Sequence, residues 1–283
     1  MTHGVLKLSC TDQIGLLAKI SGFFSHRGCN LTEVRQHTDV DTGNFFCRIE
    51  FESLSGAGVG DVSLDFETLG RELGADWKIR QRTEKYRVAL MVSRDGHCLS
   101  DLLWRWRDGS LLFDLAGVIS NHKDLNKEMD IGKASFVHIP VTKGGKDNAF
   151  NDIDEVLSSW NTDVVVLARY MQIIPPEMCQ KWEGKIINIH HSFLPAFAGG
   201  NAYQQAYRRG VKVIGATCHY VTSDLDQGPI IEQQVMRASH CHTVGELRKL
   251  GQDCERMALA RGLKFHLEDR VFCAGGRTII LGD

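Results

Sequence analysis

The length and charge of the chain are those of a globular protein that acts on small molecules. Its 283 residues are 43% hydrophobic and 24% charged, which suffices for about two domains with their own cores. Lysine plus arginine number 33 and aspartate plus glutamate 35, so the chain lacks both the basic excess typical of nucleic-acid binding and the strong acidity of a disordered protein.

The cysteines and the apolar runs indicate a cytoplasmic protein. Nine cysteines occur without a Cys-x-x-Cys pair, a pattern typical of reduced thiols. No run of about 18 apolar residues is present and the first residues lack the features of a signal peptide, so we expect no membrane interaction. His240-Cys241-His242 is the densest group of metal ligands but has no further ligands at zinc spacing, and we expect no metal site.

The first 82 residues predict a small domain of βαββαβ order. The first helix, 15–27, carries an apolar stripe at helical spacing, and Asp41-Thr42-Gly43-Asn44 predicts a hairpin turn between the two middle strands. These features favour a ferredoxin-like sandwich over residues 1–82. The predicted elements are strands at 4–9, 30–40, 44–51 and 75–82 and helices at 15–27 and 64–73.

The start of this domain, LSCTDQIGLLAKISGFFSHRGCNL, resembles an ACT domain, a regulatory module that commonly binds amino acids at dimer interfaces. The resemblance implies an amino-acid effector beside Asp12 and Gly15, and a homodimer or homotetramer. Gly15 permits a close backbone approach, and the helix behind it offers unpaired N–H groups to a carboxylate. The alternative is structural, with Asp12 capping the first helix and Gly28 ending it.

Strands and helices alternate from Tyr86 onward, which predicts a doubly wound, mostly parallel α/β domain over residues 83–283. The continuous apolar run 164–168 is typical of a strand buried on both faces of a parallel sheet. The glycine-rich stretch 55–61, in the first domain, has Asp61 where a dinucleotide fingerprint needs its third glycine. We therefore expect no nucleotide cofactor.

Three side chains of the second domain form a candidate catalytic group. Asn188 and His190 alternate along the strand 185–190 and so share one face, and Asp226 lies in the turn 223–229 after a second apolar strand. An amide that stabilises an oxyanion, an imidazole that carries a proton and a carboxylate that orients it suit attack on a carbonyl group. This chemistry needs no covalent intermediate.

The motifs NIHHSFLP and HYVTSDLDQGPI resemble the signature of the folate-dependent formyltransferase fold. The resemblance implies that Asn188, His190 and Asp226 are catalytic and act on a formyl group. It also implies a pterin pocket formed by two loops, although the apolar members of the first loop could instead pack under a helix. The loop residues are Met171, Gln172, Ile173 and Ile174, closed on the other side by Ser223, Asp224 and Leu225.

The two domains together resemble the formyltetrahydrofolate deformylase family over the whole chain. This implies a folate substrate, 10-formyltetrahydrofolate, hydrolysed to formate and tetrahydrofolate without a cofactor. The stretch 93–99 lacks the loop with which related transferases bind an acceptor's phosphate, and Arg94 and His97 are expected to narrow the acceptor channel. The family pattern is broken at Ala198, Asn201, Ala202 and Gln204, so a weakly active folate or amino-acid sensor and a formyltransferase to an unidentified amine remain alternatives.

Overall fold

The computed structural model describes residues 2–54, 56–127, 131–194 and 202–282. By contacts, the chain forms two compact units: Met1–Lys85 together with Glu268–Asp283, and Tyr86–Leu267. Within the described ranges, no helix is both long and apolar enough to cross a membrane. Of the predicted departures from the family pattern, Ala198 and Asn201 lie outside the described residues.

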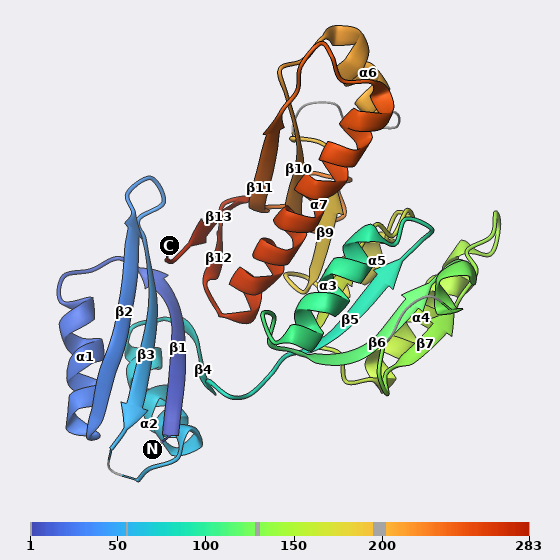
Figure 1. The fold of residues 1–283 in the computed structure, drawn as a ribbon. Helices are drawn as coiled ribbons and strands as arrows, with labels where there is room; N and C mark the ends of the chain where they lie inside the picture. Colours follow the sequence, from blue (N-terminus) through green and yellow to red (C-terminus); the bar gives the residue numbers. More distant parts are fainter. Residues whose placement is uncertain (1, 55, 128–130, 195–201, 283) are drawn as a thin grey trace. The chain divides into compact units, whose positions relative to one another are not determined.

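The first unit has the predicted βαββαβ order and an antiparallel sheet with strand order β2-β3-β1-β4 (Figure 1). Leu16, Ile20 and Phe24 lie on one side of α1, and this apolar stripe packs on the sheet together with Phe66 of α2. The elements are β1 (Thr2–Thr11), α1 (Leu16–His26), β2 (Cys29–Asp39), β3 (Asn44–Ser53), α2 (Val59–Glu72) and β4 (Asp76–Gln81).

A hairpin from the end of the chain completes this unit. Its strands are β12 (Val271–Ala274) and β13 (Arg277–Ile280). The rings of Phe272 and Phe46 lie 5.4 Å apart between centroids. Phe46 alternates along β3 with residues of the helix-covered core, so it points to the opposite face of the sheet, and the hairpin covers that face.

Ion pairs hold the same hairpin in place. A nitrogen of Arg277 lies 2.6 Å from a carboxylate oxygen of the buried Asp39, and Arg80 pairs with Asp269. We predicted one domain over residues 83–283, whereas the contacts group 268–283 with the first unit. The difference arises because these partners are separated by about two hundred residues, a distance over which no local pattern in the sequence reports contact.

The second unit is built on a seven-stranded sheet of order β11-β10-β9-β8-β5-β6-β7. The five strands β9, β8, β5, β6 and β7 are parallel to one another, while β10 pairs antiparallel with both β9 and β11. The sheet is therefore mostly parallel, as predicted. The strands are β5 (Arg87–Val92), β6 (Asp114–Ser120), β7 (Ser135–His138), β8 (Val164–Leu167), β9 (Ile186–His190), β10 (Val213–Tyr220) and β11 (Ile230–Arg237).

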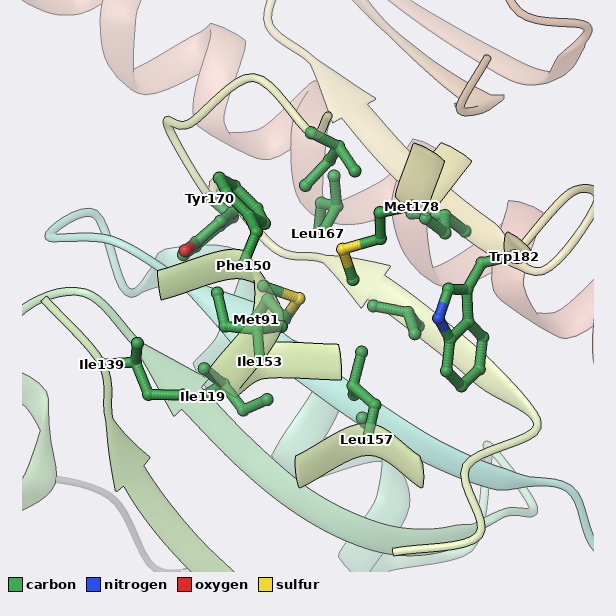
Figure 2. Close-up of a cluster of buried hydrophobic side chains, with 14 of the residues drawn as sticks. Met91, Ile119, Ile139, Phe150, Ile153, Leu157, Leu167, Tyr170, Met178 and Trp182 are labelled. Atoms are coloured by element: carbon green, nitrogen blue, oxygen red, sulfur yellow. The ribbon is translucent and has the colours of Figure 1, made fainter. Parts of the chain in front are cut away.

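Helices cover both faces of this sheet (Figure 1). One face carries α3 and α7, which contact each other, and the other carries α4 and α5. Figure 2 shows the core under α4 and α5, where Phe150, Ile153 and Leu157 pack against Met91 and Trp182. The helices are α3 (His97–Asp108), α4 (Lys146–Ser159), α5 (Pro176–Lys181), α6 (Ala202–Arg209) and α7 (Val244–Leu267), with a short 3-10 helix at Asp124–Lys127.

The parallel strands determine where the site lies. β8 and β9 pair in parallel, so their carboxyl ends reach the same edge of the sheet, where α/β proteins place ligands. All four residues of β8 are buried, as expected from the apolar run. His190 is the last residue of β9 and therefore lies at this edge.

Candidate active site

The structure brings together the three predicted catalytic side chains. Asn188 and His190 leave the same face of β9, and the turn after β10 folds back so that Asp226 reaches them. The Nδ1 atom of His190 lies 3.2 Å from Oδ2 of Asp226. Asp226 has a positive φ of 56°, in the left-handed region that non-glycine residues seldom adopt. The turn therefore holds this carboxylate in one particular place.

One ring nitrogen of His190 contacts Asp226, and the other has no hydrogen-bond partner within the described residues. Its side chain is only 7% exposed, and Nδ1 donates to the Asp226 carboxylate. Within the part of the chain that the structure describes, Nε2 makes no hydrogen bond although it is buried. Buried polar atoms are nearly always paired, so an unpaired imidazole nitrogen at a sheet edge is the expected mark of a substrate contact.

Asn188 is oriented by a histidine that the sequence analysis did not single out. His219 is buried, and its Nδ1 lies 2.8 Å from the carbonyl oxygen of Tyr220, so Nδ1 carries the proton. Its Nε2 then accepts a hydrogen bond from Nδ2 of Asn188, at 3.1 Å. Burial lowers the pKa of His219, which keeps this ring neutral. The amide nitrogen of Asn188 has a second N–H, which is suited to bind a ligand.

The signal for His219 was present in the strand pairing. His219 lies directly opposite Asn188 in the register between β10 and β9, and directly opposed residues share a face of the sheet. The sequence predicts strands at both segments but not the register in which they pair. Once the two strands are paired in antiparallel register, His219 becomes the neighbour of Asn188.

The charges around His190 favour an ionised carboxylate. The hydrogen bond from His190 is the main cause that lowers the pKa of Asp226. Asp226 is consequently a carboxylate throughout the neutral range and accepts hydrogen bonds without donating any. An imidazole held by such a carboxylate presents its other nitrogen in a fixed direction.

The predicted substrate loops differ in exposure. Met171 and Ile173 are 56% and 57% exposed, so they do not pack under a helix, whereas Ile174 is buried in the core under α5. Gln172 is half-buried. The backbone N–H of Met171 donates to Ser93 Oγ at 2.9 Å, which ties the loop to the end of β5. On the other loop, Ser223, Asp224 and Leu225 are all exposed.

The predicted effector residues lie in the first unit. Asp12 is exposed, and its side chain does not cap α1. The N-cap residue of this helix is Gly15, and no side chain makes a cap bond there. Gly15 has a φ of 86° and no other atom lies within 4 Å of the place where its Cβ would be. Gly28 follows the end of α1 with a φ of 66°, in keeping with the helix-ending role considered for it.

Gly228 sets the position of the turn that carries Asp226. A Cβ at this residue would lie 1.7 Å from the carbonyl oxygen of Tyr220, so the turn can rest against β10 only as glycine. Gly228→Ala should push the turn off β10 and separate Asp226 from His190. We therefore expect the pKa of the Asp226 carboxyl to rise toward its ordinary value of about 3.9, as measured by NMR titration.

The matched control is Gly210→Ala. Gly210 has a φ of 61° but no other atom near its missing Cβ, so alanine there adds backbone strain without a collision. The titration of Asp226 should not change in this variant. An unchanged titration in Gly228→Ala would show that the close approach of the turn does not position Asp226.

Two protein families match the chain in order. The ACT domain family matches residues 4–56, and the formyl transferase family matches residues 86–263. The second match lies within the unit that carries Asn188, His190 and Asp226. The predicted fold class, an ACT domain followed by a formyltransferase-like α/β domain, is confirmed.

Individual relatives extend this likeness over the whole chain. A formyltetrahydrofolate deformylase of Bacillus subtilis is 42% identical over 282 residues, covering 98% of this chain and 93% of the relative. A crystal structure of a formyltetrahydrofolate deformylase from Pseudomonas syringae pv. tomato has a TM-score of 0.96 at 43% identity, covering 100% of this chain and 95% of that one.

A transferase is similar over a smaller part of the chain. The crystal structure of glycinamide ribonucleotide transformylase 1 from Symbiobacterium toebii has a TM-score of 0.64 at 30% identity and covers 70% of this chain and 95% of its own. The deformylases, in contrast, match both units at higher identity. The chain therefore belongs to the formyltetrahydrofolate deformylase family.

Proposed function

We propose that this protein, a hydrolase of its family, converts 10-formyltetrahydrofolate and water to formate and tetrahydrofolate, with Asn188, His190 and Asp226 as its catalytic residues. The observation that carries the proposal is the unpaired Nε2 of His190, which is buried while Nδ1 is held by Asp226. A buried imidazole of this kind is suited to exchange a proton with a bound carbonyl compound.

The reaction begins with attack of water on the formyl carbon. A bond forms between the water oxygen and that carbon, and the carbonyl oxygen becomes an oxyanion. The remaining N–H of Asn188 and a protonated Nε2 of His190 donate to it; one such donor is typically worth about 3 kcal/mol. Oδ1 of Asp226, the oxygen not paired with His190, is available to accept the proton that water loses.

Collapse of the tetrahedral intermediate breaks the bond between carbon and N10. The departing nitrogen needs one proton, which the pair of His190 and Asp226 returns. The lowered pKa of Asp226 makes it a weak base, so its larger role is to hold the imidazole and stabilise its charged form. One proton of water goes to N10, and the other leaves when formic acid ionises to formate. The bond changes therefore balance without a cofactor.

The substrate lies along the two loops on either side of the catalytic group. Exposed apolar side chains such as Met171, Ile173 and Leu225 are suited to cover a flat pterin ring, and backbone groups of Gln172 and Ile174 to pair with its edge. The protein acts in the cytoplasm. This setting agrees with its nine free cysteines, of which only Cys241 and Cys273 are exposed.

Substitution of the catalytic pair tests the mechanism. Asp226→Asn keeps the size of the side chain but removes its charge, and His190→Ala removes the proton carrier. Formate release should fall at least about a hundredfold in each, while equilibrium binding of folate changes much less. Asp152→Asn, an exposed residue of α4, is the control for loss of one charge. Parental rates in both catalytic variants would refute the residue assignment.

The first unit binds an amino-acid effector beside Asp12 and Gly15 in a homodimer or homotetramer. The exposed carboxylate of Asp12, which makes no helix-cap bond, and the open space beside Gly15, the N-cap residue of α1, support this role. Titration of the full chain with single amino acids should change formate release, and Asp12→Ala should weaken that change. No response to any amino acid, in rate or in sedimentation, would contradict it.

A further inference from the structure

A cluster of polar side chains lies at the same edge of the sheet as the catalytic group. Within the described residues, Nε of its member Arg169 is buried and contacts a carboxylate at ion-pair distance without making a hydrogen bond. We call Glu255, His97, Arg169 and Tyr203 the Glu255 cluster. Oε2 of Glu255 lies 2.9 Å from Nε2 of His97 and 3.3 Å from Nε of Arg169, while Oε1 accepts a hydrogen bond of 2.8 Å from the Tyr203 hydroxyl. The Glu255 side chain is 1% exposed. Both of its oxygens are therefore committed inside the protein.

The charge of Glu255 is kept despite this burial. Burial alone would raise the pKa of its carboxyl, but the hydrogen bond from His97 and the positive charge of Arg169 outweigh that effect and lower it. Burial opposes the charge of Arg169 as well, yet Glu255 and Asp95 raise the pKa of the guanidinium above its ordinary value. The cluster thus contains a buried ion pair that is expensive to open.

Arg169, which supplies the cation of this ion pair, has a strained backbone conformation. Arg169 has a φ of 67°, a conformation that glycine adopts easily and arginine does not. Its carbonyl oxygen accepts a 3.1 Å hydrogen bond from the N–H of Ser93, so the conformation is fixed, and its side chain is 12% exposed. A large cation at a position suited to glycine indicates that the side chain, and not the backbone, is what this position requires.

His191 connects the cluster to the catalytic group. The ring centroids of His190 and His191 lie 4.9 Å apart, and those of His191 and Tyr203 lie 6.2 Å apart. Burial, followed by the charges of Arg169 and His190, lowers the pKa of His191 to about 4. The two ring contacts of His191 place the cluster beside the reacting groups.

We propose that the Glu255 cluster makes water the acceptor of the formyl group, because its internal ion pair and hydrogen bonds occupy the polar positions that would otherwise hold an amine beside His190. The proposal rests on the proposed hydrolysis. An amine acceptor must be bound through polar contacts before it can compete with water, and both carboxylate oxygens of Glu255 are already engaged by His97, Arg169 and Tyr203. Water needs no such recognition and enters without opening the cluster.

This view revises the expected role of the stretch 93–99. His97 is a hydrogen-bond partner of a buried glutamate on α7, and in this proposal it acts on the acceptor through that contact. Arg94 is exposed and is not a member of the Glu255 cluster. The specificity for water thus depends on contacts among α3, α6, α7 and the end of β8.

The test is the double variant Arg169→Gly with Glu255→Gln. Both charges are removed together, so no buried charge is left unpaired, and glycine adopts the φ of residue 169 without strain. The enzyme is given 10-formyltetrahydrofolate and excess glycinamide, a small primary amine, at mildly alkaline pH. In transfer, the amine nitrogen bonds to the formyl carbon, the bond to N10 breaks and one amine proton passes to N10. Formate and N-formylglycinamide are both quantified by mass spectrometry.

The parent should give formate almost alone, and the double variant should increase the fraction of formyl groups transferred to the amine at least about tenfold. The matched control is Asn161→Gly, which relieves a positive φ of 49° in the turn before β8, at the opposite end of that strand from Arg169. Its product ratio should equal that of the parent. Circular dichroism verifies that each variant is folded.

Tyr203→Phe is the second variant for this measurement, and it replaces the double variant if that protein does not fold. It removes only the hydroxyl that donates to Glu255, and it should raise amine transfer by a smaller factor. A folded, hydrolytically active variant with the parental product ratio would overturn the role of the cluster while leaving hydrolysis intact. Failure of the parent itself to release formate would instead refute the proposed function, and this inference with it.

Discussion

The contact between Nδ1 of His190 and Oδ2 of Asp226 is the interaction on which the candidate site depends. It joins a residue of the parallel part of the sheet to a turn beyond an antiparallel strand. A left-handed residue costs about 1 to 2 kcal/mol, whereas a hydrogen bond to a charged group contributes about 1.5 to 3 kcal/mol. The contact is thus strong enough to offset the strain at Asp226, and Gly228 lets the turn come close enough to make it.

Two polar groups at this sheet edge use their side chains differently, although each contains one buried nitrogen without a hydrogen bond, Nε2 of His190 and Nε of Arg169. The catalytic group leaves Nε2 of His190 unpaired within the described residues and has the second N–H of Asn188, so it can respond to a substrate. The Glu255 cluster has both carboxylate oxygens engaged and a buried charge compensated. In the proposed mechanism the catalytic group reacts with the substrate, whereas the Glu255 cluster does not bind an amine. Together these two properties favour hydrolysis over transfer.

The sequence predicted what local patterns can report. Alternation along a short strand placed Asn188 and His190 on one face, and a turn motif supplied Asp226. Glu255 could not be found in this way, because a glutamate on an amphipathic helix usually faces water, and only partners from three other segments bury it. The docking of Phe272 on Phe46 was missed for the same reason.

The most direct test of water as the acceptor is one turnover of the full chain with 10-formyltetrahydrofolate in isotopically labelled water, without any added amine. We predict that one labelled oxygen appears in each formate and that tetrahydrofolate forms in equal amount, because the new carbon–oxygen bond comes from water. Absence of formate, or formate that carries no label, would contradict hydrolysis at the site formed by Asn188, His190 and Asp226.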